Sequence, residues 1–305
     1  MDTRSDNKHD LMKRPGHATG RKMNLNIGKT GIEAKIRKEI DDRADKILRR
    51  IFSTFDMRQV EVLISELNPF FKKSFKKIIV NRNHIEKLKT LFASRKGPII
   101  FCPTHRSYVD FMVLSTILLF YGLEIPLICA GEDFLNMTYV ANQLRGCGAF
   151  FMRRTFKDDP LYKAIFYEYV AFLNKERQIL EFFVEGTRSR TNKIMQPRYG
   201  FMSVCSRTYL KKEVDDITFV PVTINYSRVL EGESFPGELR GGKKVPESVG
   251  RILTGVYDIL MTNLGTMSVD FCEPMSLKDY TAKLMSEKPE FNPFEKKPDA
   301  MVLNQ

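Results

Sequence analysis

The sequence has few of the residues that build metal and redox sites. It contains four histidines and five cysteines in 305 residues, with no CxxC pair and no His/Cys cluster. Because zinc and other soft metals are held by such clusters, we predict no metal site. The five scattered cysteines lie mostly in apolar runs such as IIFC and LICA, which indicates buried thiols in a reducing compartment.

Long apolar runs are also missing. Residues 1–29 are polar and basic, so they do not resemble a signal peptide. The strongest apolar stretch, residues 111–123, is too short to span a bilayer, and we expect no transmembrane helix. The final residues, VLNQ, match no peroxisomal or ER-retention signal.

Several catalytic and nucleotide-binding motifs are absent. Seven residues separate Gly20 from the GKT at 28–30, where a P-loop needs four, and no GxGxxG follows the first predicted strand. Ser107 lies in no nucleophile elbow, and Cys102 lies inside an apolar strand. These features argue against a nucleotide site and against a covalent serine or cysteine mechanism.

The charge balance is what the sequence has in excess. The formal net charge is +12 on an otherwise ordinary globular composition, with 43% hydrophobic and 28% charged residues. This excess predicts an acidic partner: a phosphate-bearing small molecule, an anionic membrane surface or nucleic acid. No helix-turn-helix, RNP or zinc-finger signature is present, so we expect no nucleic-acid partner.

Short apolar runs separated by helix-length segments predict the fold. The six runs are 98–104, 125–131, 148–152, 179–186, 217–226 and 267–274. Such alternation predicts an α/β fold with a mostly parallel central sheet flanked by helices. We divide the chain into a flexible basic arm (1–30), an N-terminal helical region (31–95), an α/β domain (96–280) and a C-terminal tail (281–305) that we expect to fray.

The N-terminal region has a helical periodicity. Apolar residues every three to four positions predict helices over 32–55, 60–66 and 84–94. The segment 69–80, PFFKKSFKKIIV, predicts a further helix with two interpretations. It is either an interfacial membrane helix that uses Phe70 and Phe71, or a core helix with a solvated lysine face.

The first predicted strand of the α/β domain ends in residues suited to proton transfer. His105 follows the strand, and Asp110 comes five residues later in the first turns of a predicted helix. A carboxylate that accepts from one imidazole nitrogen leaves the other nitrogen basic, which is the arrangement that activates a hydroxyl. The alternative is structural: Ser107 or Asp110 caps the helix beside a histidine with no catalytic role.

Arginines follow the third and fourth predicted strands of this domain. Arg153 and Arg154 end one strand, and Arg188, Ser189 and Arg190 follow the next. Because strand ends gather at one edge of an α/β sheet, we expect these residues to converge on a phosphate, although an ordinary solvated role for Arg153 and Arg154 stays open. The backbone around Gly186 and Thr187 could donate to an oxyanion.

Four blocks of the sequence resemble one known family. HRSYVD, GAFFMRR, FVEGTRSR and VPVTINY resemble, in this order, the blocks of the glycerolipid acyltransferases, over roughly residues 75–275. The resemblance implies acyl transfer from acyl-CoA to the primary hydroxyl of dihydroxyacetone phosphate or glycerol 3-phosphate. It makes His105 the base and Asp110 its partner, and it places Pro221 on the acyl-CoA side. It assigns the acceptor to Arg153, Arg154, Glu185, Gly186, Thr187, Arg188, Ser189 and Arg190.

The same resemblance implies the setting of the reaction. It needs no cofactor, because acyl-CoA is a co-substrate, and it implies a peripheral membrane enzyme, peroxisomal or at the ER or mitochondrial membrane. Peroxisomal members of the family carry a long C-terminal region and a targeting tripeptide that this sequence lacks. A catalytically silent protein that binds a membrane surface is the alternative to an enzyme.

Overall fold

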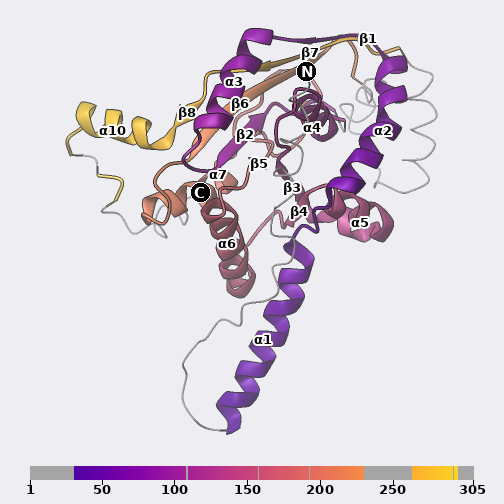
Figure 1. The fold of residues 1–305 in the computed structure, drawn as a ribbon. Coiled ribbons are helices and arrows are strands. Elements are labelled where there is room, and N and C mark those ends of the chain that lie inside the picture. Colours follow the sequence, from indigo (N-terminus) through magenta and orange to yellow (C-terminus); the bar gives the residue numbers. More distant parts are fainter. Residues whose placement is uncertain are drawn as a thin grey trace, which may run out of the picture.

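A computed structural model of the chain describes residues 31–107, 109–156, 158–191, 193–229, 263–290 and 292–294. Its fold is α/β: one sheet lies between two groups of helices (Figure 1). The strands are β1 (Phe75–Val80), β2 (Ile99–Pro103), β3 (Leu127–Gly131), β4 (Ala149–Met152), β5 (Leu180–Glu181), β6 (Thr218–Tyr226), β7 (Gly265–Phe271) and β8 (Met275–Ser276). The helices are α1 (Gly31–Ile51), α2 (Met57–Ser74), α3 (Arg82–Ser94), α4 (Asp110–Phe120), α5 (Thr138–Gly146), α6 (Pro160–Lys175), α7 (Gly200–Leu210) and α10 (Leu277–Glu287), with a 3₁₀ turn η2 (Glu132–Asn136).

The sheet confirms the predicted alternation. Its order is β1-β7-β6-β2-β5-β3-β4, with β8 also paired to β6. The five strands β6, β2, β5, β3 and β4 pair in parallel, whereas β7 and β8 pair antiparallel to β6. The carboxyl ends of the parallel strands therefore open onto one edge, where ligands of such sheets usually bind.

Two hydrophobic cores cover the two faces of the sheet. On one face, α2, α3 and α4 pack over apolar residues that include Ile99 and Phe101. On the other, α1, α6 and α7 pack over a core that includes Ile100 and Phe150. Successive residues of a strand point to opposite faces, so the near-continuous apolar runs of the sequence supply both cores at once.

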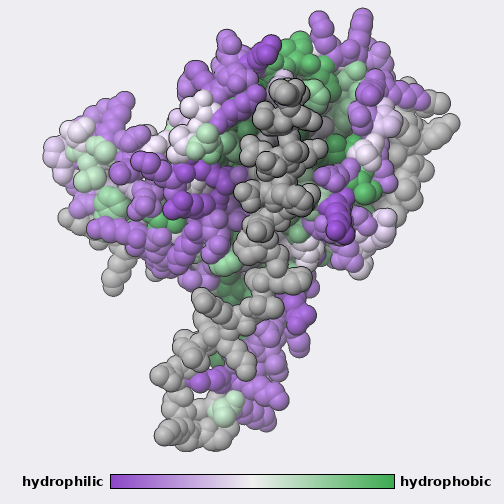
Figure 2. All heavy atoms as spheres, viewed as in Figure 1, coloured by the Kyte–Doolittle hydropathy of each residue, from purple (hydrophilic) through white to green (hydrophobic). Residues whose placement is uncertain are grey.

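Helix α1 extends away from the body in Figure 1. Its last turns bury Ile47 and Ile51 in the core beneath α6, while Ile36 and Ile40 lie about half exposed on its earlier turns. Figure 2 shows the coloured surface of this projecting part as mainly hydrophilic. The periodic apolar stripe predicted over 32–55 thus meets the core only at its carboxyl-terminal end.

The structure corrects the prediction for residues 69–80. Helix α2 ends at Ser74, and Phe75–Val80 form β1, an edge strand in parallel pairing with β7. Phe70 and Phe71 are buried in the core, so they are not the apolar face of an interfacial helix. The run Lys-Lys-Ile-Ile-Val carries β-branched residues, and lysines are common on exposed sheet edges.

Two other sequence-based expectations have different outcomes. Helix α10 ends at Glu287 and so crosses the boundary at residue 280, where a fraying tail was expected to begin. The predicted flexible arm, residues 1–30, lies outside the described residues. Within the part of the chain that the structure describes, no helix has both the length and the apolar character needed to cross a bilayer.

Candidate functional site

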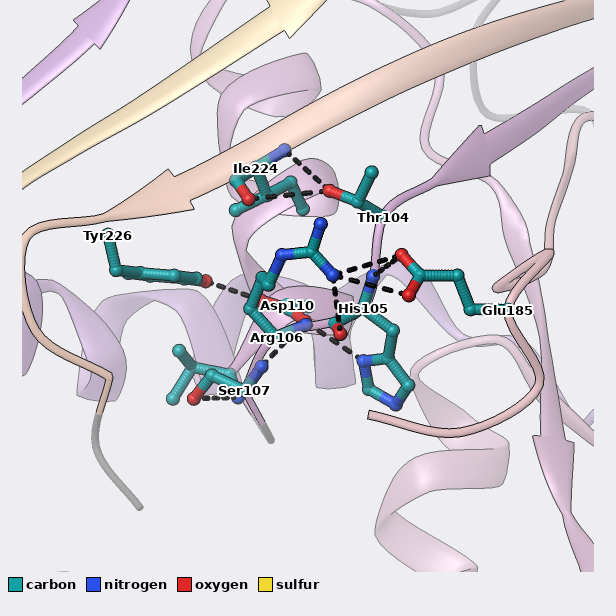
Figure 3. Close-up of polar contacts among 9 residues, drawn as sticks. Thr104, His105, Arg106, Ser107, Asp110, Glu185, Ile224 and Tyr226 are labelled. Atoms are coloured by element: carbon teal, nitrogen blue, oxygen red, sulfur yellow. Dashed lines mark hydrogen bonds and ion pairs between the residues drawn. The ribbon is translucent and has the colours of Figure 1, made fainter. Parts of the chain in front are cut away.

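The predicted histidine and aspartate meet at the end of β2. The strand β2 is fully buried. Thr104, the residue after it, continues the pairing with β6: the Thr104 N–H donates to the Val222 carbonyl, and the Thr104 Oγ1 accepts from the Ile224 N–H. The next residue, His105, places Nδ1 2.9 Å from Oδ2 of Asp110, the first residue of α4 (Figure 3). The structure therefore brings the two residues together as the sequence spacing predicts.

Asp110 is held by an unusually complete set of donors. Its Oδ2 also accepts from the Arg106 and Ser107 N–H groups at 2.6 and 2.8 Å. Its Oδ1 accepts from the Tyr226 hydroxyl at 2.5 Å, and the side chain has no exposed surface. A buried carboxylate is costly unless hydrogen-bonded, and the positive end of the α4 dipole favours it further. These contacts fix the carboxylate that orients His105.

The imidazole of His105 is fixed on its other side by an aromatic ring. Phe183 stacks against it with ring centroids 4.0 Å apart and an interplanar angle of 23°. The His105 side chain is 19% exposed, and no hydrogen bond from the described residues engages its Nε2. Figure 3 shows this nitrogen on the side of the ring away from Asp110. The ring is therefore held on the Nδ1 side and against one face, and it is partly exposed elsewhere.

A buried ion pair supports the same loop from below. The Arg106 guanidinium donates through Nη1 to both oxygens of Glu185, at 3.1 and 3.2 Å, and neither side chain is more than 4% exposed. Glu185 also accepts from the backbone N–H groups of His105 and Met195, each at 3.1 Å. The carboxylate predicted to contact the acceptor thus holds together the segments on either side of the site.

The turn after β5 lies directly against His105. The Ser189 N–H donates to the His105 carbonyl at 2.8 Å, and the Ser189 hydroxyl donates to the Lys193 carbonyl. Gly186 has a φ of +65°, and a Cβ there would approach Arg198 Cδ to 2.8 Å. The Gly186 N–H already donates to the Phe183 carbonyl. Thr187, the other residue predicted to donate to an oxyanion, is exposed beside it. Arg188 and Arg190 flank the buried Ser189 on this turn.

The other predicted arginines, Arg153 and Arg154, line a separate cavity of about 290 Å³. Arg153 contacts Asp159 at 2.9 Å and Glu132 at 3.5 Å, and its guanidinium lies 4.2 Å from the Tyr162 ring centroid. Arg154 pairs with Asp133. The lining is Glu132, Asp133, Arg153, Arg154, Thr155, Asp158 and Asp159, and it does not include the arginines of the turn after β5.

The lining of this cavity carries four carboxylates and two guanidinium groups, so acidic side chains outnumber basic ones. The pKa of Asp159 is lowered, first by the hydrogen bond from the Tyr162 N–H and then by Arg153 and Arg43. Burial raises the pKa of Tyr162 to about 12. In the sheet order, β4 lies three interstrand spacings from β2. The end of β4, where Arg153 and Arg154 stand, is therefore about 14 Å along the sheet edge from the end of β2, where His105 stands. Convergence of both arginine groups on one small anion stays a prediction.

Pro221 is aligned with Cys102 of β2, and it lies at a gap in the pairing on the other side of β6. Residues 218–219 of β6 pair with β8 and residues 222–226 pair with β7, so proline falls between the two ladders, where no N–H is needed. Its carbonyl accepts from the Cys272 N–H at 2.9 Å. The contact of Pro221 with acyl-CoA, which the family resemblance implies, stays a prediction.

Cysteine and metal chemistry receive no support in the described part of the chain. Cys102 is buried in β2, and burial raises its thiol pKa to about 12, which opposes formation of the nucleophilic thiolate. No group of three or more His, Cys, Asp or Glu side chains among the described residues could hold a metal ion.

Sequence reasoning missed four residues at this site. Tyr226 and Phe183 contact the two sides of the His105–Asp110 pair, Arg106 pairs with Glu185, and Glu181 lies fully buried on β5. No hydrogen-bond partner in the structure engages either Glu181 oxygen, and its pKa is raised well above the usual value by burial and then by the charge of Asp110. A polar residue inside an apolar run was the only sequence signal available for Glu181.

The fold and the site define an α/β protein with a histidine–aspartate pair at the carboxyl edge of its sheet. Comparison with known families gives two matches: "Acyltransferase" over residues 78–225, and "Glycerol-3-phosphate acyltransferase C-terminal region" over residues 236–303. The first match contains β2, α4 and the turn after β5, and it ends one residue before Tyr226. The chain belongs to the glycerolipid acyltransferase family.

Curated relatives carry two different names. The chain is 39% identical to the dihydroxyacetone phosphate acyltransferase of Mus musculus over 79% of its own length and 35% of the relative's. It is 42% identical to a glycerol-3-phosphate acyltransferase of Pseudomonas putida over 75% of its length and 27% of the relative's. The chain thus spans about a third of the length of the curated relatives that it matches.

Among solved structures, one similar protein is the 1-acyl-sn-glycerophosphate acyltransferase PlsC of Thermotoga maritima. The match covers 84% of this chain and 81% of that one, at 14% identity and a TM-score of 0.37.

Proposed function

We propose that this chain transfers a long-chain fatty acyl group from acyl-CoA to the primary hydroxyl of dihydroxyacetone phosphate. The observation that carries the proposal is His105, whose Nδ1 is held by the buried Asp110 and whose side chain is partly exposed. An oriented imidazole of this kind is suited to take a proton from a hydroxyl. The similarity to dihydroxyacetone phosphate acyltransferases over most of this chain supports the acceptor.

In the proposed reaction, His105 Nε2 takes the proton of the acceptor hydroxyl as its oxygen attacks the thioester carbonyl. A C–O bond forms, and the carbonyl oxygen becomes an oxyanion beside the exposed Gly186–Thr187 turn. When the tetrahedral intermediate collapses, the C–S bond breaks and the CoA thiolate takes the proton back from the imidazolium. Asp110 stabilises that imidazolium and keeps the ring oriented throughout.

Glycerol 3-phosphate is the alternative acceptor. A relative of that specificity is as similar to this chain as the dihydroxyacetone phosphate enzymes are. The two acceptors share the phosphate and the primary hydroxyl and differ at the central carbon. The proposal assigns the shared phosphate to Arg188 and Arg190, because their turn is bonded to the His105 backbone through Ser189.

The setting of the proposed reaction is a membrane surface. The acylated product is an amphiphile that partitions into lipid, and the chain carries a net charge of +12. A peroxisomal location remains a prediction from the family resemblance, with the ER and mitochondrial membranes as alternatives. A fluorescent fusion of the full-length protein, imaged beside organelle markers, tests it.

The decisive experiment measures release of CoA thiol from palmitoyl-CoA, in parallel with dihydroxyacetone phosphate and glycerol 3-phosphate. We expect acceptor-dependent release that is lost in His105→Ala and retained in His84→Ala, its matched control outside the site. Absence of release with either acceptor from folded protein on lipid vesicles would contradict the proposal. A preference for glycerol 3-phosphate would keep the reaction and correct the acceptor.

A second variant tests the phosphate assignment. Arg188→Ala should raise the KM for the acceptor about 10- to 100-fold, because a charge-assisted hydrogen bond contributes about 1.5 to 3 kcal/mol. The KM for palmitoyl-CoA should change little. Equal changes in the two KM values would remove Arg188 from acceptor recognition.

A further inference from the structure

The segment that begins in the turn after β5 is strongly basic. Between Glu185 and Glu213 the sequence contains no acidic residue, and residues 188–200, called here the basic loop, carry Arg188, Arg190, Lys193 and Arg198. The side chains of Lys193 and Arg198 are exposed. Concentration of one charge sign on a single loop creates a local field that attracts an anionic surface.

The basic loop also exposes apolar side chains. Ile194 is 78% exposed and Tyr199 is 48% exposed, although each side chain is large enough to gain from burial. Single exposed apolar residues are common and need no explanation. Here they stand among cations, and this combination of basic and apolar side chains is typical of segments that bind the interface of a bilayer.

Backbone hydrogen bonds hold the loop in this exposed arrangement. The Met195 N–H donates to Glu185 at 3.1 Å, and the Arg198 N–H donates to the Val184 carbonyl at 2.7 Å. The Ser189 hydroxyl closes the first part of the loop on the Lys193 carbonyl. Ile194 therefore lies between two anchored points, so its exposure follows from the loop geometry.

The position of the loop relates it to the reaction. Its Ser189 N–H bonds to the carbonyl of His105, and its Met195 bonds to the carboxylate that also holds the His105 N–H. A surface bound by this loop would lie beside the catalytic histidine. The proposed product, an acylated glycerol phosphate analogue, is an anionic amphiphile that must leave toward lipid.

We propose that the basic loop is the docking surface for an anionic lipid bilayer, with Ile194 and Tyr199 inserted at the interface and Lys193 and Arg198 against the headgroups. This inference deepens the proposed function, because it places a membrane at the mouth of the catalytic site. Phe70 and Phe71, the side chains predicted to contact a membrane in the segment 69–80, are buried and form no part of this surface.

The absence of tryptophan from the chain allows a sharp test. In Ile194→Trp the indole is the only tryptophan fluorophore, and Tyr280→Trp on α10, 59% exposed in the native chain, is the matched control. With vesicles of phosphatidylcholine and phosphatidylserine, we expect the Ile194→Trp emission to shift to the blue and to be quenched by lipid-borne quenchers. The Tyr280→Trp emission should stay unchanged. Tyr199→Trp provides a second reporter if Ile194→Trp lowers the melting temperature.

The electrostatic part is tested by co-sedimentation with the same vesicles. Lys193→Ala should weaken binding about fivefold, since a basic residue near an anionic membrane contributes about that factor. Lys211→Ala, an exposed lysine beyond α7, should change binding less. Binding should also fall as salt rises and should be weak on vesicles of phosphatidylcholine alone.

These measurements need no acyl-CoA and no turnover, so they can fail or succeed separately from the proposed reaction. An unmoved Ile194→Trp emission while the protein sediments with vesicles would overturn the docking surface. So would an equal response of Tyr280→Trp, or the absence of sedimentation with anionic vesicles. Lost turnover together with intact docking would overturn the reaction and leave the surface in place.

Discussion

Two histidine–aspartate pairs stand among the described residues, and they differ in how the carboxylate is held. His84 Nδ1 lies 2.6 Å from Asp270 Oδ1, closer than the 2.9 Å between His105 and Asp110. Yet Asp270 is 46% exposed, whereas Asp110 has no exposed surface and accepts four hydrogen bonds. Distance alone does not favour the His105–Asp110 pair; burial and the partners of the carboxylate do.

Replacement of the two histidines should separate the pairs most clearly. We expect His105→Ala to lower kcat about 10²- to 10⁴-fold, the usual range for loss of a positioned general base. His84→Ala should keep kcat within about twofold, because its exposed pair contributes about 0.2 to 1 kcal/mol to stability and nothing to proton transfer. Thiol release at saturating substrates measures both. Comparable losses in the two variants would end the distinction between the pairs.

Carboxylates near the two pairs should differ in their effect on stability. Glu185→Ala leaves the buried Arg106 without its partner, so we expect a loss of about 3 to 5 kcal/mol in the free energy of unfolding. Glu273, which pairs with Lys87 near His84, is exposed, and Glu273→Ala should leave stability unchanged. Urea unfolding followed by circular dichroism measures both variants. A small loss in Glu185→Ala would mean that Arg106 finds another partner or water.

Tyr226 distinguishes the His105–Asp110 pair, because its hydroxyl donates to Oδ1 of Asp110, the oxygen that His105 does not contact. Tyr226→Phe removes a hydrogen bond to a charged group, which contributes about 1.5 to 3 kcal/mol. We expect a fall of about 10-fold or more in kcat with little change in either KM, because the ring and its packing remain. Tyr280→Phe, at an exposed position on α10, is the control. An unchanged kcat would show that the other three donors suffice to hold Asp110.

The comparison also explains how far the sequence could lead. His105 and Asp110 stand five residues apart across a strand–helix junction, so their contact could be predicted from spacing, and the six apolar runs predicted six of the eight strands. His84 and Asp270 stand 186 residues apart, and their meeting depends on the pairing of β1 with β7. That pairing overrode the helical pattern of residues 75–80. Tyr226 was missed for a similar reason, because the alignment of β6 with β2 determines that its hydroxyl meets Asp110.

Glu181 should produce the smallest effect and the most informative dependence on pH. Burial and Asp110 raise its pKa above that of the unfolded chain, so its contribution to stability is fully present below the unfolded pKa, about 4.3, and is lost as pH rises toward the folded pKa. Gln cannot titrate. The free energy of unfolding of Glu181→Gln should therefore increase relative to that of the wild type as pH rises above about 4.

Urea unfolding across this pH range checks the expectation, and Glu181→Leu is the control for packing. Leucine also cannot titrate, so the difference in free energy of unfolding between Glu181→Leu and the wild type should grow with pH as it does for Glu181→Gln. The two variants should differ from each other by a constant amount, because leucine changes the shape and polarity of the side chain. A difference that stays constant with pH for both variants would mean that Glu181 ionises as readily in the folded chain as in the unfolded one. Growth in both would establish that Glu181 is a neutral acid in the folded chain, next to the carboxylate that contacts His105.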